Sequence, residues 1–313
     1  ESLAGFHPIV DNVIVYRKLT KLKSTYVEGL IKTIADDGRI HSKFTQTVTQ
    51  TGRISSIEPN LQNIPVRTEL GRQLRKAFVA EDGNLLIDAD YSQIELRLLA
   101  HISGDKTMQK AFCDGVDIHT VTASEIFGLP TEMVTAEMRS RAKTVNFGIV
   151  YGIGEFSLSK DLKIPRKEAK RYIESYLATY SGVDAYMKKA VEKAQETGYV
   201  ETLFGRRRYV PELFSKNKQI QAFGQRVCRN TPIQGTAADL IKLAMIRVFE
   251  RLKKEIPEAK LILQVHDELI VEAPEEKANA AAEILKSEME NVAKLSVPLV
   301  ADVGTGKTWY EAH

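Results

Sequence analysis

Residues 261–271 have the sequence LILQVHDELIV, and this stretch decides the predicted fold. Two short apolar runs flank the polar triplet His266-Asp267-Glu268, a pattern typical of a β-hairpin with a polar tip. The segment from Asn84 to Asp90 has an apolar body and predicts a third strand, and a fourth is expected near residues 297–303. Together these segments predict one small antiparallel sheet.

Helical patterns dominate residues 92–260, which we expect to form a second, helix-rich subdomain. Because the strands do not alternate regularly with helices, the chain is predicted to be an α+β protein. A helix is expected from about Ser92 to Ile102, where Ser92 and Glu95 have the spacing of a capping box. Other helices are expected over residues 8–36, 116–180, 182–197, 217–230, 233–254 and 275–294.

The composition is that of a globular protein without a membrane span. The chain has 313 residues, 43% of them hydrophobic and 27% charged, so about two domains are expected. Its net charge of +3 excludes a strongly basic tail and an acidic disordered chain. The distant cysteines Cys113 and Cys228 indicate a reducing compartment. No signal peptide is recognised, and the first residue, Glu1, is not Met, which indicates a fragment of a longer product.

Two acidic residues end predicted strands or turns. Asp90 ends the third strand and Asp267 sits at the hairpin tip, while Asp88 shares a strand face with Asp90. Carboxylates about 4 Å apart repel by about 4 kcal/mol at an effective dielectric near 20, so a buried pair requires a cation or a proton. Such oxygen ligands suit Mg2+. Taken singly, however, each residue is better explained structurally, Asp90 as the cap of a helix start and Asp267 as a turn residue.

A stripe of two cations and two aromatic rings recurs every four residues at Arg139, Lys143, Phe147 and Tyr151. Four residues turn a helix by about 400°, so the stripe lies on one slowly drifting helix face. A triphosphate could meet the cations while a base stacks near the rings. The alternative is an ordinary amphipathic helix with core rings and solvated cations.

Residues 51–67 contain two prolines and predict a long ordered loop of the kind that is often functional. This loop and the later helices carry candidate DNA-binding side chains, because arginine meets phosphates while amides reach base edges. The candidates are Arg53, Arg67, Arg206, Arg207, Arg208, Arg226 and Arg229, with Asn60, Gln62, Asn63, Asn230 and Gln234.

Residues 301–308, ADVGTGKT, approximate a phosphate-binding P-loop with Ala in place of the first Gly. A P-loop must open a helix whose amides face the phosphates. Only five residues follow Thr308, so we predict a strand and a turn here instead.

Taken together, these segments resemble the polymerase domain of the family A DNA polymerases, the family of bacterial DNA polymerase I. The resemblance lies in DYSQIELR at residues 90–97, in residues 139–152 and in QVHDE at residues 264–268. Residues 51–65 and TPIQG at residues 231–235 are similar to further family segments. The likeness covers almost the whole chain, with several long motifs in the family's order.

The resemblance implies a right-hand fold with a small antiparallel palm sheet and helical fingers. Residues 1–50 would be a remnant of the thumb and the start of the palm, 51–115 the first part of the palm, 116–225 the fingers and 226–313 the second part of the palm. Only residues near 8–30 resemble the thumb, so a truncated thumb and a weak grip on the duplex are expected. Neither proofreading nor 5' nuclease activity is expected of this chain.

The resemblance also implies a site. Asp90 and Asp267, assisted by the Tyr91 carbonyl, would hold two Mg2+ ions, and Lys143 would be a catalytic proton donor to pyrophosphate. The nucleotide-binding residues would be Tyr91, Gln93, Glu95, His119, Arg139, Lys143, Phe147 and Tyr151. The primer–template would be contacted by Arg53, Gln62, Arg67, Arg226, Asn230, Gln234 and His266.

The expected activity is template-directed addition of dNTPs to a primer 3'-end, in DNA repair and replication gap filling. The protein would act as a monomer in the bacterial cytoplasm, at the nucleoid. Glu95 matches the family residue that blocks a ribose 2'-hydroxyl, which argues against the related single-subunit RNA polymerases. Two alternatives stay open: a non-catalytic duplex-binding module, and a nucleoside-triphosphate hydrolase built on residues 301–308.

Overall fold

The computed structural model describes residues 3, 5–66 and 68–313, and within it the chain forms two compact units. Unit 1 consists of Glu1–Asp90, Arg247–Lys286 and Asp302–His313. Unit 2 consists of Tyr91–Ile246 and Ser287–Ala301. Across the described ranges, no helix is long and apolar enough to cross a membrane.

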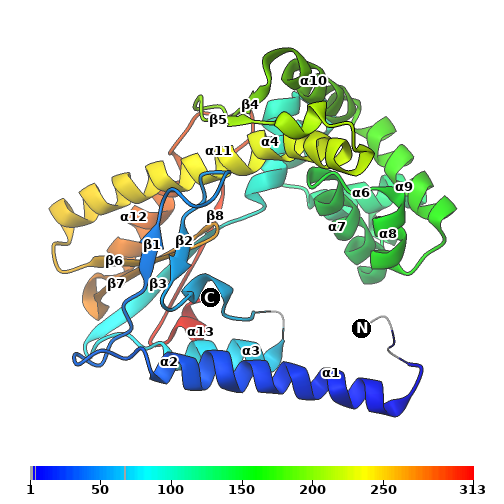
Figure 1. Cartoon of the computed structure of the whole chain (residues 1–313). Coiled ribbons are helices and arrows are strands. Elements are labelled where there is room, and N and C mark those ends of the chain that lie inside the picture. Colours follow the sequence, from blue (N-terminus) through cyan, green and yellow to red (C-terminus); the bar gives the residue numbers. More distant parts are fainter. Residues whose placement is uncertain (1–2, 4, 67) are drawn as a thin grey trace. The chain divides into compact units, whose positions relative to one another are not determined.

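The centre of unit 1 is a four-stranded sheet with the order β6-β7-β3-β8 (Figure 1). Its strands are β3 (Asn84–Tyr91), β6 (Lys260–Val265), β7 (Glu268–Pro274) and β8 (Ala301–Gly306). Strand β7 runs antiparallel to both β6 and β3, so the predicted hairpin and its pairing with the third strand are confirmed. The fourth strand lies slightly later in the sequence than predicted.

The core of unit 1 packs on one face of this sheet. Leu86 and Ile270 lie on that face with the fully buried Trp309 and with Tyr26. Since side chains at i and i+2 share a face, Asp88 and Asp90 lie on the same side of β3 as Leu86. These two acidic side chains therefore lie on the face of the sheet that also carries the apolar core, beyond Leu86 along β3.

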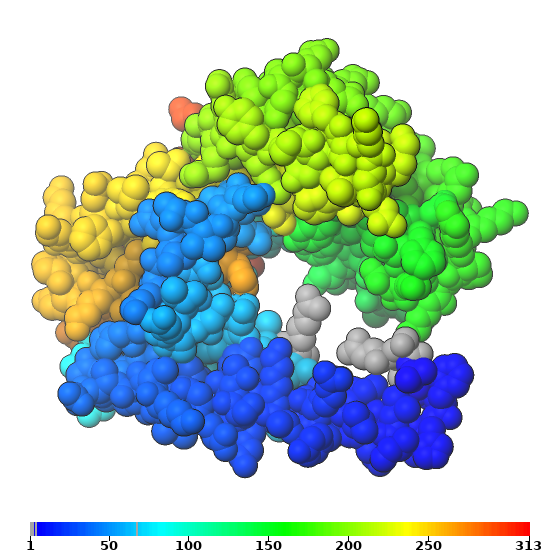
Figure 2. Space-filling model, viewed as in Figure 1, coloured from blue at the N-terminus to red at the C-terminus, as the bar shows by residue number. Residues whose placement is uncertain are grey.

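Short elements complete unit 1, and most of them precede the sheet in sequence. They are α1 (Pro8–Lys21), η1 (Leu22–Glu28), α2 (Gly29–Ile31), β1 (Lys43–Thr45), β2 (Ser55–Ile57), η2 (Leu61–Asn63), α3 (Glu69–Gln73), η3 (Leu74–Ala77), η6 (Glu275–Lys277) and α13 (Trp309–Ala312). Helix α1 buries no residue, and its side chains form the dark blue surface in Figure 2. Tyr26 in η1 connects this segment to η2, because its hydroxyl donates a hydrogen bond to the Asn63 carbonyl at 2.6 Å.

The loop predicted over residues 51–67 contains regular structure that the sequence did not indicate. Strand β2 pairs antiparallel with β1, and η2 follows it. The buried Ser56 hydroxyl accepts the Leu61 amide at 3.0 Å, and this polar contact ties the strand to the helical turn. Tertiary hydrogen bonds, rather than local propensity, therefore order this segment.

Unit 2 is helical, as predicted, apart from one small hairpin. Its elements are α4 (Ile94–Ser103), α5 (Lys106–Cys113), α6 (Ile118–Phe127), η4 (Thr131–Met133), α7 (Ala136–Val150), α8 (Glu155–Leu162), α9 (Arg166–Thr179), α10 (Ser181–Thr197), β4 (Tyr199–Glu201), β5 (Arg207–Tyr209) and η5 (Pro211–Phe214). Two more helices, α11 (Lys218–Glu255) and α12 (Ala278–Glu290), begin in one unit and end in the other.

The prediction of two helices over 217–230 and 233–254 was wrong, because α11 is continuous through Pro232. A proline inside a helix removes one backbone hydrogen bond. Here the following turn is deeply buried, with Ile233 and Leu240 fully inaccessible, and the Thr236 hydroxyl donates to the Pro232 carbonyl. The gain from packing outweighs the local cost of the proline.

The predicted capping box at Ser92 and Glu95 was also wrong. Helix α4 begins at Ile94, and its N-cap is Gln93, whose φ of 54° is left-handed. Ser92 makes backbone hydrogen bonds instead. Its amide N–H donates to the Val300 carbonyl at 2.9 Å, and its carbonyl accepts a hydrogen bond from Arg97 Nε at 2.8 Å. The strand thus continues past Asp90 before the chain turns sharply into the helix.

The P-loop-like segment forms strand β8, as predicted, followed by the four-residue helix α13, which was not predicted. Thr308 and Glu311 form the capping box of this helix. A Cβ atom at Gly304 would collide with the Ala312 carbonyl oxygen, and one at Gly306 with Glu311 Cβ. These glycines serve close packing of the C-terminal segment on its own strand.

We therefore predict that Gly304→Ala destabilises the chain by about 1–3 kcal/mol, the range for overpacking a tight contact. Thermal unfolding measures this loss as a lower Tm. Thr305→Val, on the exposed side of the same strand, is the matched control and should change stability by less than about 0.5 kcal/mol. Equal Tm values for Gly304→Ala and the parent chain would contradict the packing role.

Candidate active site

The pairing of β3 with β7 brings the two predicted acidic residues to the same end of these two central strands. Asp90 lies opposite Glu268 in the β3–β7 register, so Asp267 directly precedes Asp90's partner. His266 and Asp267 form the two-residue turn of the hairpin, and His266 has the left-handed φ of 53° that such turns require. Both carboxylates are half-buried.

Burial and like charge disfavour the ionised forms of both carboxylates. Burial, followed by the nearby charges of Asp267 and Glu268, raises the pKa of Asp90 to about 7. Burial also raises the pKa of Asp267, against the opposing influence of Arg53. Two mutually repelling oxygen ligands fit a hard divalent ion such as Mg2+, because the ion would replace repulsion by attraction.

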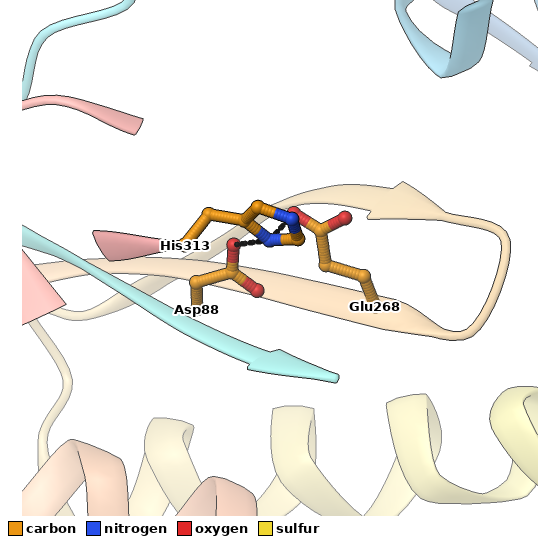
Figure 3. A group of neighbouring side chains, drawn as sticks. All are labelled: Asp88, Glu268 and His313. Carbon is orange, nitrogen blue, oxygen red and sulfur yellow. Dashed lines mark hydrogen bonds and ion pairs between the residues drawn. The ribbon is translucent and has the colours of Figure 1, made fainter. Parts of the chain in front are cut away.

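A second group of titratable side chains adjoins this pair: Asp88, Glu268 and His313 (Figure 3). His313 Nδ1 lies 3.3 Å from Asp88 Oδ2 and 3.8 Å from Glu268 Oε1. Their possible ligand atoms lie within 4.8 Å of one another. The sequence had suggested only Asp88 of these three, through its shared strand face with Asp90.

Neighbouring side chains fix Glu268 within this second cluster. Glu268 Oε1 accepts the indole N–H of Trp309 at 2.7 Å, and Arg75 Nη1 lies 3.6 Å from the same oxygen. The Arg75 guanidinium also stacks 4.0 Å above the Trp309 ring. Burial raises the pKa of Asp88 to about 6 and raises that of Glu268 as well. The cluster thus ties the C-terminal segment to the residue beside Asp267.

In unit 2, helix α7 carries the predicted cation and ring stripe on its accessible face. Arg139, Lys143 and Tyr151 are exposed and Phe147 is half-buried. The opposite face is buried through Ala142, Val145, Asn146, Ile149 and Val150. Tyr151, which is 44% exposed, is therefore not a core residue, whereas the half-buried Phe147 is compatible with either explanation of the stripe.

Arg139 is held by an acidic partner. Its Nε and Nη2 donate to the two carboxylate oxygens of Asp117 at 2.7 and 3.1 Å. Partial burial alone would raise the pKa of Asp117, but hydrogen bonds from Arg139 and Thr120 lower it to about 2. The pair uses one edge of the guanidinium and leaves the Nη1 edge to meet another anion.

His119, beside Asp117, is almost fully buried. Its ring centroid lies 5.8 Å from that of Phe147, and its Nδ1 lies 2.9 Å from Asn146 Nδ2. Burial lowers the pKa of His119 to about 4, and the Arg139 and Lys143 charges act in the same direction, so the ring is neutral near pH 7. Asn146 was not singled out in the sequence, since its only signal is its place beside Phe147.

The remaining nucleotide-binding candidates lie around the start of α4. Tyr91 is buried, and its hydroxyl donates to the Met289 carbonyl at 2.7 Å. Gln93 occupies the left-handed turn, and Glu95 is 4% exposed in the first turn of the helix.

The DNA-binding candidates fall into one set in each unit. In unit 1, Gln62 Nε2 donates to the Gln264 carbonyl at 3.2 Å, close in sequence to the exposed His266, and Arg53 acts electrostatically on Asp267. In unit 2, Arg226, Asn230 and Gln234 recur every four residues along α11 and are all partly or fully exposed. Arg67 lies outside the described residues.

Comparison with known proteins identifies the family. The profile of DNA polymerase family A matches residues 1–311. The chain therefore belongs to DNA polymerase family A, which confirms the resemblance found in the sequence.

Individual relatives agree with this assignment. The chain is 52% identical over 313 residues to a thermostable DNA polymerase I of Thermus aquaticus and 52% identical over 314 residues to the DNA polymerase I of Bacillus subtilis. The alignments cover all of this chain but only 37% and 36% of those proteins.

A solved structure shares the fold. It is the POL domain of Pol1 from M. smegmatis, in complex with DNA primer-template and dNTP, with a TM-score of 0.95 and 44% sequence identity. The match covers 98% of this chain and 54% of that one.

The raised pKa of Asp90 predicts how pH affects stability. The folded chain binds this proton up to about pH 7, whereas the unfolded chain loses it near 3.8, so stability falls as pH rises through that window. Asp90→Asn removes the buried charge. In metal-free buffer it should raise the Tm at about pH 8 and change it little at about pH 3.5, where the carboxyl is protonated in both states.

The control is Asp82→Asn, since Asp82 is an exposed acid that precedes the same strand. It should not raise the Tm at the higher pH. A gain in Asp90→Asn that is equal at both pH values would show that burial and repulsion of the charge are not its cause.

Proposed function

We propose that this chain is a DNA-directed DNA polymerase that adds dNTPs to the 3'-end of a primer. The observation that carries the proposal is the pair Asp90 and Asp267, two half-buried carboxylates whose mutual repulsion calls for a divalent cation. A duplex-binding module has no use for such a pair. Membership in DNA polymerase family A, and the primer-template and dNTP bound to the similar POL domain, support the same activity.

Asp90, Asp267 and the Tyr91 carbonyl would hold two Mg2+ ions. When bound, these ions would supply acidification of the primer hydroxyl and charge neutralisation at the leaving pyrophosphate. The protein's own contribution is positional: the β3–β7 register keeps the two carboxylates at one strand end, and the tight turn at His266 limits their movement. In phosphoryl transfer, positioning and charge account for most of the catalysis.

The α7 stripe would bind the incoming nucleotide. Arg139 would meet the triphosphate through its Nη1 edge while Asp117 holds the other edge. Lys143, exposed one turn further along, would bind the phosphates and donate a proton to pyrophosphate. Phe147 would pack on the sugar and base, Tyr151 would take a place in the template stack, and His119 and Gln93 would complete the triphosphate site.

The primer–template would be contacted by both sets of polar residues. They are Arg53, Gln62 and His266 in unit 1 and Arg226, Asn230 and Gln234 in unit 2, together with Arg67, which lies outside the described residues. In this proposal residues 116–225 are fingers, and the segments 51–115 and 226–313 build the palm, with residues 1–50 joining a thumb remnant to it. The protein would act as a monomer in repair and gap filling at the bacterial nucleoid.

Asp267→Asn tests the proposal most simply. Loss of one carboxylate should reduce Mg2+-dependent primer extension at least about 1,000-fold, because the change removes a metal ligand that acts in the transition state. The dissociation constant for primer–template should stay within about threefold of that of the parent chain. The rate of primer extension and the dissociation constant are both measured on the full chain with a labelled primer.

Asp82→Asn, at an exposed acid that precedes β3, is the control and should extend primers normally. Extension by Asp267→Asn at the parent rate would overturn the proposed mechanism. If the parent chain binds duplex DNA but never extends a primer in Mg2+, the duplex-binding alternative is favoured instead. DNA-independent ATP turnover would revive the hydrolase alternative.

Glu95→Ala tests sugar selection separately. The buried carboxylate would exclude a ribose 2'-hydroxyl, so its removal should raise the kcat/KM for ribonucleotides relative to deoxyribonucleotides at least about tenfold, roughly 1.4 kcal/mol of discrimination. The control is Glu125→Ala, at an exposed position of α6. Unchanged sugar selectivity in Glu95→Ala would leave this residue without a role in specificity.

A further inference from the structure

Helices α6 and α7 pack together (Figure 1) and enclose a chain of buried polar side chains that the proposed reaction does not use directly. Asn146 is completely buried on α7, between Lys143 and Phe147 in the sequence of the stripe. Thr122 and His119 contact it from α6, and Tyr180, the residue before α10, contacts Thr122. A buried polar side chain is costly unless it is hydrogen-bonded, so each contact here constrains its neighbours.

Both ends of the Asn146 amide are occupied. Its Nδ2 lies 2.9 Å from His119 Nδ1, and its Oδ1 lies 3.1 Å from the Thr122 hydroxyl. The single Thr122 hydroxyl proton is shared between Asn146 Oδ1 and the Ile118 carbonyl at 2.8 Å, and the Tyr180 hydroxyl lies 3.0 Å from the same oxygen. In the structure the amide nitrogen thus faces His119 and the amide oxygen faces Thr122.

This orientation determines where the imidazole carries its proton. A neutral imidazole has one N–H, and the nitrogen that accepts a hydrogen bond cannot hold it. The amide N–H donates to Nδ1, so the proton resides on Nε2. Protonation of both nitrogens is opposed by burial and by the Arg139 and Lys143 charges, with only Asp117 acting in favour of it.

We propose that Asn146 is a positioning residue that holds His119 as the neutral Nε2–H tautomer, so that the ring offers a hydrogen-bond donor to the triphosphate. Phosphate oxygens accept hydrogen bonds only, so the Nδ1–H tautomer would present a repelling lone pair at Nε2. The role in nucleotide binding rests on the proposed function, whereas the tautomer itself does not.

The tautomer can be measured in the free protein. Long-range 1H–15N spectra of the full chain, labelled at histidine, distinguish a protonated from an unprotonated ring nitrogen, and His119→Gln assigns the signals. We expect an unprotonated Nδ1 and a protonated Nε2 near pH 7. The reverse pattern, in which Nδ1 donates to a flipped amide, would overturn the proposal without touching the proposed polymerase function.

Asn146→Asp tests the role of the amide, because a carboxylate accepts hydrogen bonds and cannot donate to Nδ1. The proton should move from Nε2 to Nδ1, because burial and the Arg139 and Lys143 charges oppose a doubly protonated ring, and the signals of the two ring nitrogens should change accordingly. Asn217→Asp, which adds the same charge at an exposed position of unit 2, should leave the His119 signals unaltered. An unchanged His119 spectrum in Asn146→Asp would exclude Asn146 as the determinant.

Primer extension then separates positioning from general damage. Asn146→Asp should raise the KM for dNTP about tenfold, the loss of one hydrogen bond to a charged group, with a smaller change in kcat and an unchanged primer–template affinity. In the His119→Gln background, whose amide nitrogen can donate in place of Nε2, the same substitution should cost less than about twofold in KM. A full additional tenfold loss there would mean that Asn146 acts structurally and would contradict the proposal.

Discussion

The repulsion between the carboxylates of Asp90 and Asp267 is the constraint on which the rest of unit 1 depends. Burial, together with the charges of Asp267 and Glu268 that the strand register places nearby, raises the pKa of Asp90 to about 7. Any rearrangement that separated the two carboxylates would relieve the repulsion. The surrounding structure must therefore resist that movement whenever no cation is bound.

The C-terminal segment supplies part of that resistance. Glu268, which pairs with Asp90 and follows Asp267, is fixed by the Trp309 indole and the buried Arg75. Trp309 can reach it because Gly304 lets the last helix lie directly on β8. A segment whose sequence resembles a nucleotide-binding loop thus serves to brace the acidic site. In unit 2, the partly buried Asp117 holds Arg139, and the buried Asn146 contacts His119.

Sequence patterns predicted the secondary structure correctly where the local pattern of apolar and polar residues matches the buried and exposed faces of the element. The hairpin around Asp267 and the strand to Asp90 follow from short apolar runs, and the stripe along α7 follows from a spacing of four residues. Predictions failed where a distant partner decides the local structure: Ser92 bonds to Val300 instead of capping a helix, and burial carries α11 through Pro232. Sequence patterns predict no role for the side chains of Glu268, His313 and Asn146, because these residues act through contacts between segments far apart in the chain.

The most direct test of the central claim is the affinity of the chain for Mn2+, a paramagnetic substitute for Mg2+, measured by electron paramagnetic resonance as a function of pH. If the paired carboxylates form the cation site, affinity should rise steeply as pH increases through about 7 and level off above it, because the ion must displace the proton on Asp90. Asp267→Asn should abolish this pH-dependent binding. Affinity that is independent of pH across this range, or that persists unchanged in Asp267→Asn, would contradict the account.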